Sequence, residues 1–204
     1  GTLQSKDAEI EMSIYGEQET AMQAALAAVL EGIEEVREEL KERNGMDPVD
    51  HIMARIKSEE SMRAKCRKRG LPETSESALV EIRDAIGIRV VTSFVSDVFD
   101  VAKRLPEIPD CVVVEQKDYI HHAKPNGYRS LHVILRYREQ FYVEIQLRTI
   151  SMDTWAALEH HMRYKKEIGG NQELIAAELK RCADELASTD MSMQTIRDMI
   201  LEEI

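Results

Sequence analysis

The sequence has few aromatic residues, few cysteines and no long apolar run. Aromatic side chains make up 5% of its 204 residues, and there is one tryptophan. No apolar run approaches the ~18 residues that span a bilayer, and residues 1–20 contain no signal-peptide core. The three cysteines are far apart and form no CxxC pair or His/Cys cluster, which excludes a zinc ribbon and argues against a disulfide scaffold. We therefore expect a cytoplasmic globular protein with reduced thiols and no membrane partner.

Positive charge is also scarce overall, but it is concentrated in one region. The formal net charge is −11, which at face value argues against a nucleic-acid partner. Residues 1–50 carry a net charge of −9, residues 167–204 carry −6, and the stretch between them carries +4. Seven lysines and arginines lie in His51–Gly70 alone. A lone basic run is most often a solvated helix face; the alternative here is a site for an anionic ligand between acidic flanks.

Both ends of the chain have the apolar periodicity of helices. Residues 20–44 repeat apolar side chains every three or four positions, with glutamates between them. Asn44-Gly45 is expected to end this helix, and Asp47-Pro48 is expected to start the next one. Residues 171–187 repeat the pattern, and a separate last helix is expected from about Asp190.

The centre of the chain is mixed. Two β-branched runs, Ile88–Phe94 and Cys111–Glu115, are strand candidates, and residues 98–105 between them can form a crossover helix. Leu131–Tyr137 and Phe141–Arg148 have the pattern of an antiparallel hairpin. In the second of these strands apolar and polar side chains alternate, so that one face carries a polar ladder. Such a ladder is most often only a solvated sheet face.

These elements predict an α/β (α+β) fold with a mixed, roughly five-stranded sheet flanked by helices. We expect three parts: an acidic helical extension over 1–50, a core over 51–166, and C-terminal helices over 167–204 that serve in oligomerisation.

The basic segment and the residues after it have the types that bind a metal-bound polyphosphate. If the segment is helical, Lys57, Ser61 and Lys65 lie one turn apart on one face, with Arg55 close by. Asp84 stands at the entry to the first predicted strand and can ligate Mg²⁺, although it could instead only pair with a nearby arginine. No Walker A or GxGxxG motif is present, so neither a P-loop nor a Rossmann site accounts for the basic segment.

Two further segments carry polar side chains of complementary types. The loop over 119–132 is rich in hydrogen-bond donors, and Tyr128 offers a flat face for stacking a base; the same segment also reads as an ordinary turn. The polar ladder includes Glu144, and Trp155 follows it in a position typical of the core. Each segment is a weak signal alone, and their combination favours a nucleotide site.

Taken together, the motifs RxKxxxSxxxK, DxxGxR, KPNGYRSLH, EIQLRT and WAxxEH resemble the synthetase domain of the RelA/SpoT family, over about residues 51–161. The resemblance implies a nucleotidyltransferase-like fold. Because the chain has no His-Asp dipeptide and no room for the family's hydrolase or regulatory domains, it resembles a stand-alone small alarmone synthetase. Ala123 departs from the proline that is frequent in the family before the lysine of the third motif.

The resemblance implies an enzyme that transfers the β,γ-pyrophosphate of ATP to the ribose 3′-OH of GDP or GTP, which makes (p)ppGpp for the stringent response. Asp84 would hold Mg²⁺, and Glu144 would act as a second metal ligand or as the base for the 3′-OH. The ATP-binding residues would be Arg55, Lys57, Ser61, Lys65 and Arg89. The residues that bind GDP or GTP would be Lys124, Asn126, Tyr128, His132, Gln146 and Arg148.

Two alternatives remain open. The same chemistry could act on an adenine nucleotide or on a tRNA 3′ end; the acidic flanks argue against tRNA and leave adenine possible. The chain could also be a catalytically inactive nucleotide-binding module, but it retains Asp84 and Glu144, which favours an enzyme. For assembly, the resemblance implies a homotetramer, and because homo-oligomers are usually built from two-fold contacts we expect a dimer of dimers. We expect the apolar face of the last helix to lie at an interface; this face comprises Met193, Ile196, Met199 and Ile200.

Overall fold

A five-stranded mixed sheet lies at the centre of the computed structural model, which describes residues 13–164 and 171–202. The strands are β1 (Val49–Ile56), β2 (Ile86–Thr92), β3 (Cys111–Asp118), β4 (Leu131–Tyr137) and β5 (Phe141–Thr149). The helices are α1 (Glu19–Asn44), α2 (Glu59–Lys68), α3 (Val95–Arg104), α4 (Ile150–Tyr164) and α5 (Gln172–Glu202). Three short helical segments span Gly16–Gln18, Ser77–Glu81 and Leu105–Glu107.

The strand order is β1-β2-β5-β4-β3. β2 and β5 run parallel, and every other neighbouring pair is antiparallel. The parallel pair requires a crossover, which begins with α3 where the sequence predicts a helix. The mixed sheet and the four strands expected in the centre are therefore confirmed.

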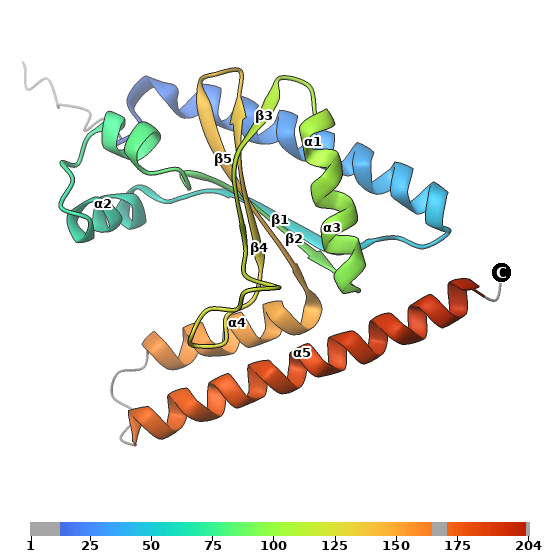
Figure 1. The fold of residues 1–204 in the computed structure, drawn as a ribbon. Coiled ribbons are helices and arrows are strands. Elements are labelled where there is room, and N and C mark those ends of the chain that lie inside the picture. Colours follow the sequence, from blue (N-terminus) through green and yellow to red (C-terminus); the bar gives the residue numbers. More distant parts are fainter. Residues whose placement is uncertain (1–12, 165–170, 203–204) are drawn as a thin grey trace, which may run out of the picture.

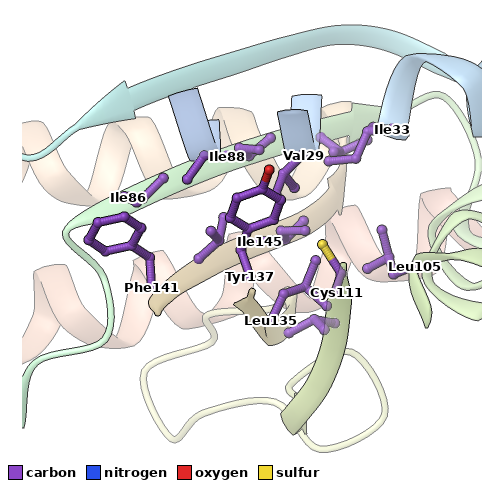
Figure 2. Packing of buried hydrophobic residues seen from close by; sticks show 14 of the residues in the cluster. Val29, Ile33, Ile86, Ile88, Leu105, Cys111, Leu135, Tyr137, Phe141 and Ile145 are labelled. Atoms are coloured by element: carbon purple, nitrogen blue, oxygen red, sulfur yellow. The ribbon is translucent and has the colours of Figure 1, made fainter. Parts of the chain in front are cut away.

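One face of the sheet is covered by α1 and α3 (Figure 1). Val29 and Ile33 of α1 point toward isoleucines of the central strands, among them Ile88 and Ile145 (Figure 2). All four side chains are at most 2% exposed. The periodic apolar residues predicted for the first helix therefore build the core, and the opposite face of the sheet is left for polar groups.

The first correction concerns residues 47–56, where the sequence predicted the start of a helix. Val49–Ile56 instead forms β1, an edge strand paired with β2. The Asp47 carboxylate accepts hydrogen bonds from the Arg37 side chain and from the backbone N–H of Val49, so it shapes a turn into the strand. Most side chains of β1 are not buried, so the apolar alternation that marks a strand is weak here.

The second correction concerns the C-terminus, where one continuous helix, α5, replaces the two that the sequence predicted. Asp190, the expected start of the last helix, is 3% exposed, and its carboxylate accepts a 2.6 Å hydrogen bond from the Thr149 hydroxyl. Arg197 pairs with Asp97 of α3 at 2.7 Å. These buried contacts dock α5 beside α4 at the end of the sheet where β5 terminates (Figure 1).

The described helices include none with both the length and the apolar character that a membrane crossing requires. The expected boundary between the core and the C-terminal helices, at residues 166 and 167, lies outside the described residues.

Candidate active site

The polar ladder of β5 lies on the sheet face opposite α1 and α3. Glu144, Gln146 and Arg148 alternate with buried apolar residues, as the sequence predicted. The Gln146 amide donates to Glu144 Oε1 at 3.0 Å, and the Arg148 guanidinium donates to Gln146 Oε1. Across the sheet, Gln146 pairs with Arg89 of β2 on one side and with His132 of β4 on the other. The strand register therefore brings residues from three strands together on one face.

A pocket of about 300 Å³ opens beside this ladder. We call it the Asp84 pocket. Its lining residues are Met53, Ala54, Arg55, Lys57, Asp84, Gly87, Ile88, Arg89, Glu144 and Gln146. Six of these ten residues carry polar or charged side chains, which suits a charged ligand better than an apolar one.

The Asp84 carboxylate binds two lysine side chains at this pocket. Its Oδ2 accepts hydrogen bonds from Lys57 Nζ at 2.6 Å and from Lys65 Nζ at 2.7 Å. The Asp84 side chain is 17% exposed. Burial alone would raise the pKa of this carboxyl, but the two ammonium groups outweigh burial and lower the pKa. Two positive charges thus face this carboxylate. With Arg55 and Arg89 also in the lining, the four cations outnumber the two carboxylates, Asp84 and Glu144, and leave a net positive charge for an anion.

Lys57 reaches this point from a different element than the sequence predicted. It lies directly after β1, while Ser61 and Lys65 belong to α2, whose N-cap is Ser58. The three residues therefore do not share one helix face. The lysines still meet, because the Lys57 backbone N–H bonds to the carbonyl of Ala85, next to Asp84.

Glu144 is the second carboxylate of the Asp84 pocket. Burial raises the pKa of Glu144, and the negative charge of nearby Asp84 raises it further. Within the described residues, the buried Asp84 Oδ1 has no hydrogen-bond partner. Two carboxylates that repel each other, one with an unsatisfied oxygen, form a donor set that fits a divalent cation. Mg²⁺ is commonly held by one or two carboxylates together with substrate phosphates.

No cluster of three or more His, Cys, Asp or Glu side chains suited to a metal occurs among residues 13–164 and 171–202. A cation at Asp84 and Glu144 would complete its coordination with oxygen atoms of water and of a bound substrate.

A second pocket, of about 410 Å³, adjoins the first. We call it the Tyr128 pocket. The two pockets share Arg55, Arg89 and Gln146. The remaining lining residues are Tyr128, Arg148, Asp153, Ala156, Ala157, Glu159, His160, His161 and Arg163. Side chains predicted for a donor nucleotide and for an acceptor nucleotide thus meet along a common wall.

The loop between β3 and β4 presents an aromatic and cationic group to the Tyr128 pocket. The Tyr128 hydroxyl lies 2.7 Å from His132 Nε2. The ammonium of Lys124 lies 4.7 Å from the ring centroid of Tyr119 and 5.2 Å from that of Tyr128, and the Arg148 guanidinium lies 5.8 Å from the Tyr128 centroid. Burial, followed by the charges of Lys124 and Arg148, lowers the pKa of His132 to about 4. His132 is therefore neutral at physiological pH.

Five predicted site residues in the described part of the chain do not line either pocket: Ser61, Lys65, Lys124, Asn126 and His132. Three of these contact a residue that does, because Lys65 bonds Asp84 and both Lys124 and His132 contact Tyr128. Ser61 and Asn126 instead make local contacts. Ser61 is exposed, and its hydroxyl is hydrogen-bonded to that of Ser58 at 2.9 Å. The Asn126 side chain accepts from the backbone N–H of Tyr128 at 3.0 Å, an Asx turn that shapes the loop. The lining residues of both pockets exclude Ser61 and Asn126.

Sequence reasoning missed two residues that touch the site. Tyr15, 2% exposed, donates its hydroxyl to the carbonyl oxygen of Lys57 at 2.5 Å. Asp153, in the first turn of α4, lies within 3.6 Å of both Arg89 and Arg148. Tyr15 precedes the first helix and carries no local signal. Asp153 falls between the motifs EIQLRT and WAxxEH, and its closeness to those motifs was the available clue.

The sequence is similar to a known protein family and to characterised relatives. A family model described as a region found in RelA / SpoT proteins matches residues 54–169. The GTP pyrophosphokinase YwaC of Bacillus subtilis is 38% identical over 161 residues, which are 76% of this chain and 76% of the relative.

Solved structures agree with the sequence comparison. The small alarmone synthetase 2 from Bacillus subtilis superposes with a TM-score of 0.75 at 34% identity, over 88% of this chain and 96% of that one. The small alarmone synthetase 1 from Bacillus subtilis, bound to its product pppGpp, superposes with a TM-score of 0.69 at 28% identity, over 89% and 98%.

Proposed function

Since the chain belongs to the RelA/SpoT family, we propose that it is a GTP pyrophosphokinase, which transfers the β,γ-pyrophosphate of ATP to the 3′-OH of GDP or GTP. The observation that carries this proposal is the pair of adjoining pockets: one is lined by Lys57, Asp84 and Glu144, with Lys65 bonded to Asp84, and the other is lined by Tyr128.

The Asp84 pocket is the proposed site of ATP. Lys57 and Lys65 would exchange part of their contact with Asp84 for the phosphates, because polyphosphate oxygens compete well for ammonium groups. Arg55 and Arg89 stand on the wall between the pockets, where their planar guanidinium groups can stack on adenine. Ser61 stays a predicted phosphate ligand, and its hydroxyl would have to leave Ser58 to act as one.

The Tyr128 pocket is the proposed site of GDP or GTP. The Tyr128 ring offers a stacking surface, and its hydroxyl bond to His132 limits its rotation. Lys124, Gln146 and Arg148 supply donors for the acceptor's base, ribose or phosphates. Asn126 serves this site through the turn that it stabilises.

Pyrophosphoryl transfer depends on positioning and on neutralising charge more than on covalent help from the protein. When bound by Asp84 and Glu144, Mg²⁺ would neutralise phosphate charge and orient the transferred group. Glu144 would serve either as a second ligand of this cation or as the proton acceptor for the ribose hydroxyl.

Assembly and location are further parts of the proposal. The exposed apolar residues of α5 offer a surface for contact between copies of the chain, which supports the proposed homotetramer. The three cysteines are free and far apart, which supports a cytoplasmic location.

The test is synthesis of (p)ppGpp from ATP and GDP or GTP with Mg²⁺, measured by thin-layer chromatography with labelled ATP. Asp84→Asn and Glu144→Gln should each lower turnover by a hundredfold or more, since removal of one electrostatic stabiliser typically costs about 10²–10³ in kcat. The matched control is Asp110→Asn, which removes an exposed carboxylate bonded to Arg138 at 3.1 Å, outside both pockets.

Near-normal turnover in Asp84→Asn or Glu144→Gln would refute the role of that carboxylate. If product formed only with ADP or deacylated tRNA, the pyrophosphoryl transfer would be confirmed but the proposed acceptor, GDP or GTP, would be wrong. No product with any acceptor would indicate a nucleotide-binding module.

A further inference from the structure

Asp153 lines the Tyr128 pocket and lies beside Arg89, which belongs to the wall that the two proposed nucleotide sites share. It lies in the first turn of α4, directly after β5, so its place is set by the strand that carries Glu144, Gln146 and Arg148. Its side chain is 23% exposed. It is thus a partly buried carboxylate in a pocket that is lined by four arginines.

The Asp153 carboxylate faces two guanidinium groups from different strands. Oδ1 lies 3.6 Å from Arg89 Nη1 and 3.6 Å from Arg148 Nε, and Oδ2 lies 3.9 Å from His51 Nε2. These distances are those of ion pairs and exceed hydrogen-bond length. Within the described residues, the buried Nε atoms of Arg89 and Arg148 have no hydrogen-bond partner. Asp153 therefore supplies charge to both arginines without occupying their donors.

Arg89 and Arg148 need a counter-charge at this point. They extend from the neighbouring parallel strands β2 and β5 toward the same face of the sheet. The Arg148 side chain is 4% exposed. Burial lowers the pKa of Arg148, and the charge of Arg89 lowers it further, whereas Tyr128 and Asp153 act in the opposite direction. The Arg89 side chain is 37% exposed, so only Arg148 is shielded from solvent. Without Asp153, less negative charge would offset the repulsion between the two guanidinium groups.

We propose that Asp153 is a positioning residue that holds Arg89 and Arg148 side by side, and thereby aligns the donor nucleotide with the acceptor nucleotide. This inference rests on the proposed function, in which Arg89 contacts ATP and Arg148 contacts GDP or GTP. It assigns Asp153 no contact with the reacting atoms.

The experiment compares Asp153→Asn, which removes the charge at constant shape, with Asp153→Glu, which restores it. Asp50→Asn is the matched control: Asp50 is exposed and bonds His51 at 2.7 Å, so it touches the same histidine but neither arginine. The readouts are KM for ATP, KM for GDP, kcat, and the dissociation constant of a non-hydrolysable ATP analogue measured by calorimetry.

In Asp153→Asn we expect both KM values and the analogue's dissociation constant to rise about tenfold, which corresponds to about 1.4 kcal/mol each. Asp153→Glu should recover at least part of this loss, and Asp50→Asn should match the wild type. A merely structural role would lower the active fraction, and hence kcat, and leave both KM values unchanged.

Unchanged KM values and analogue binding in Asp153→Asn would overturn the inference, as would a rise in only one of the two KM values. An inactive wild type would instead refute the proposed function. In that case the analogue's dissociation constant would still decide whether Asp153 positions Arg89.

Discussion

His132 is the residue at which the site and the stability of the fold are most directly connected. It is neutral in the folded protein because burial and three nearby cations, Lys124, Arg148 and Lys117, lower its pKa to about 4, whereas in an unfolded chain its pKa is ~6.5. Between these values the unfolded state binds more protons than the folded state. Stability therefore rises with pH across this window and is lost as pH falls.

We predict that lowering the pH from 7 to 5 reduces the free energy of unfolding through His132 by up to about 2 kcal/mol, since one pKa unit corresponds to ~1.4 kcal/mol. The measurement is urea unfolding at both pH values for the wild type, for His132→Gln and for the control His122→Gln, which replaces an exposed histidine. His132→Gln should lose this pH dependence and His122→Gln should keep it. If the free energy of unfolding fell by the same amount between pH 7 and pH 5 in all three proteins, His132 would not titrate as described.

At the scale of single residues, the polar ladder of β5 could be predicted because a strand has a period of two, which sequence shows directly. Lys57 could not be placed correctly, because its spacing to Ser61 and Lys65 also fits a helix. The local sequence does not show that Ser58 is the N-cap of α2, which leaves Lys57 just outside the helix. Asp153 and Tyr15 were missed because their roles depend on contacts between elements that are distant in sequence.

At the scale of elements, the loop that carries Tyr128 is supported by α5. Gly127 has φ +104°, and a Cβ there would lie 2.8 Å from the Cβ of Ala183 on α5. Arg129 pairs with Asp184 at 3.0 Å, and the Trp155 indole donates to the carbonyl of Leu179 at 2.7 Å. The loop, α4 and α5 thus pack as one unit beneath the acceptor pocket.

Gly127→Ala should lower stability by about 1–3 kcal/mol, because it adds backbone strain and a contact with a helix that cannot move easily. It should also raise KM for GDP more than KM for ATP, since only the Tyr128 loop is displaced. The matched control is Gly45→Ala, which has φ +71° but no atom within 4 Å of its added Cβ. Gly45→Ala should lose stability through strain alone and keep both KM values; an unchanged KM for GDP in Gly127→Ala would show that α5 does not support the loop.

The elements themselves differ in how well sequence predicts them. The hairpin of β4 and β5 was predicted within a residue, because each strand alternates and the turn between them is short. The continuity of α5 was not, because Ser188, Thr189 and Asp190 have the composition of a helix start. The Asp190 carboxylate bonds to Thr149 on β5 instead. This tertiary contact outweighs the preference of these residues for a helix start, and the sequence around Asp190 does not indicate it.

At the scale of the whole molecule, the C-terminal half of α5 leaves an apolar face uncovered. Ile196, Met199 and Ile200 are 56–58% exposed and lie at the i, i+3 and i+4 positions of one helix face. Burying such a face in a partner removes apolar area from water, which favours association by ~25 cal/mol per Å² before the cost of assembly.

We predict that light scattering finds a tetramer for the wild type and a smaller species for the double variant Ile196→Lys, Ile200→Lys. Val112→Lys is the control, because Val112 is 61% exposed on the edge strand β3, away from α5. These substitutions are preferable to shortening the chain, which would also remove the buried contacts of Asp190 and Arg197. A monomeric wild type would refute the assembly outright, and a double variant that stays tetrameric would place the interface elsewhere.

The wall that the two pockets share has a kinetic consequence. With Arg55, Arg89 and Gln146 lining both pockets, two nucleotides bound at once would lie against each other, and neither would have to leave before the other entered. Direct transfer in a ternary complex follows, so double-reciprocal plots of rate against ATP at several fixed GDP concentrations should intersect. A ping-pong enzyme, in which a covalent intermediate separates the two half-reactions, would give parallel lines. Parallel lines would therefore mean that the pockets are occupied in turn and that the shared wall serves one nucleotide at a time.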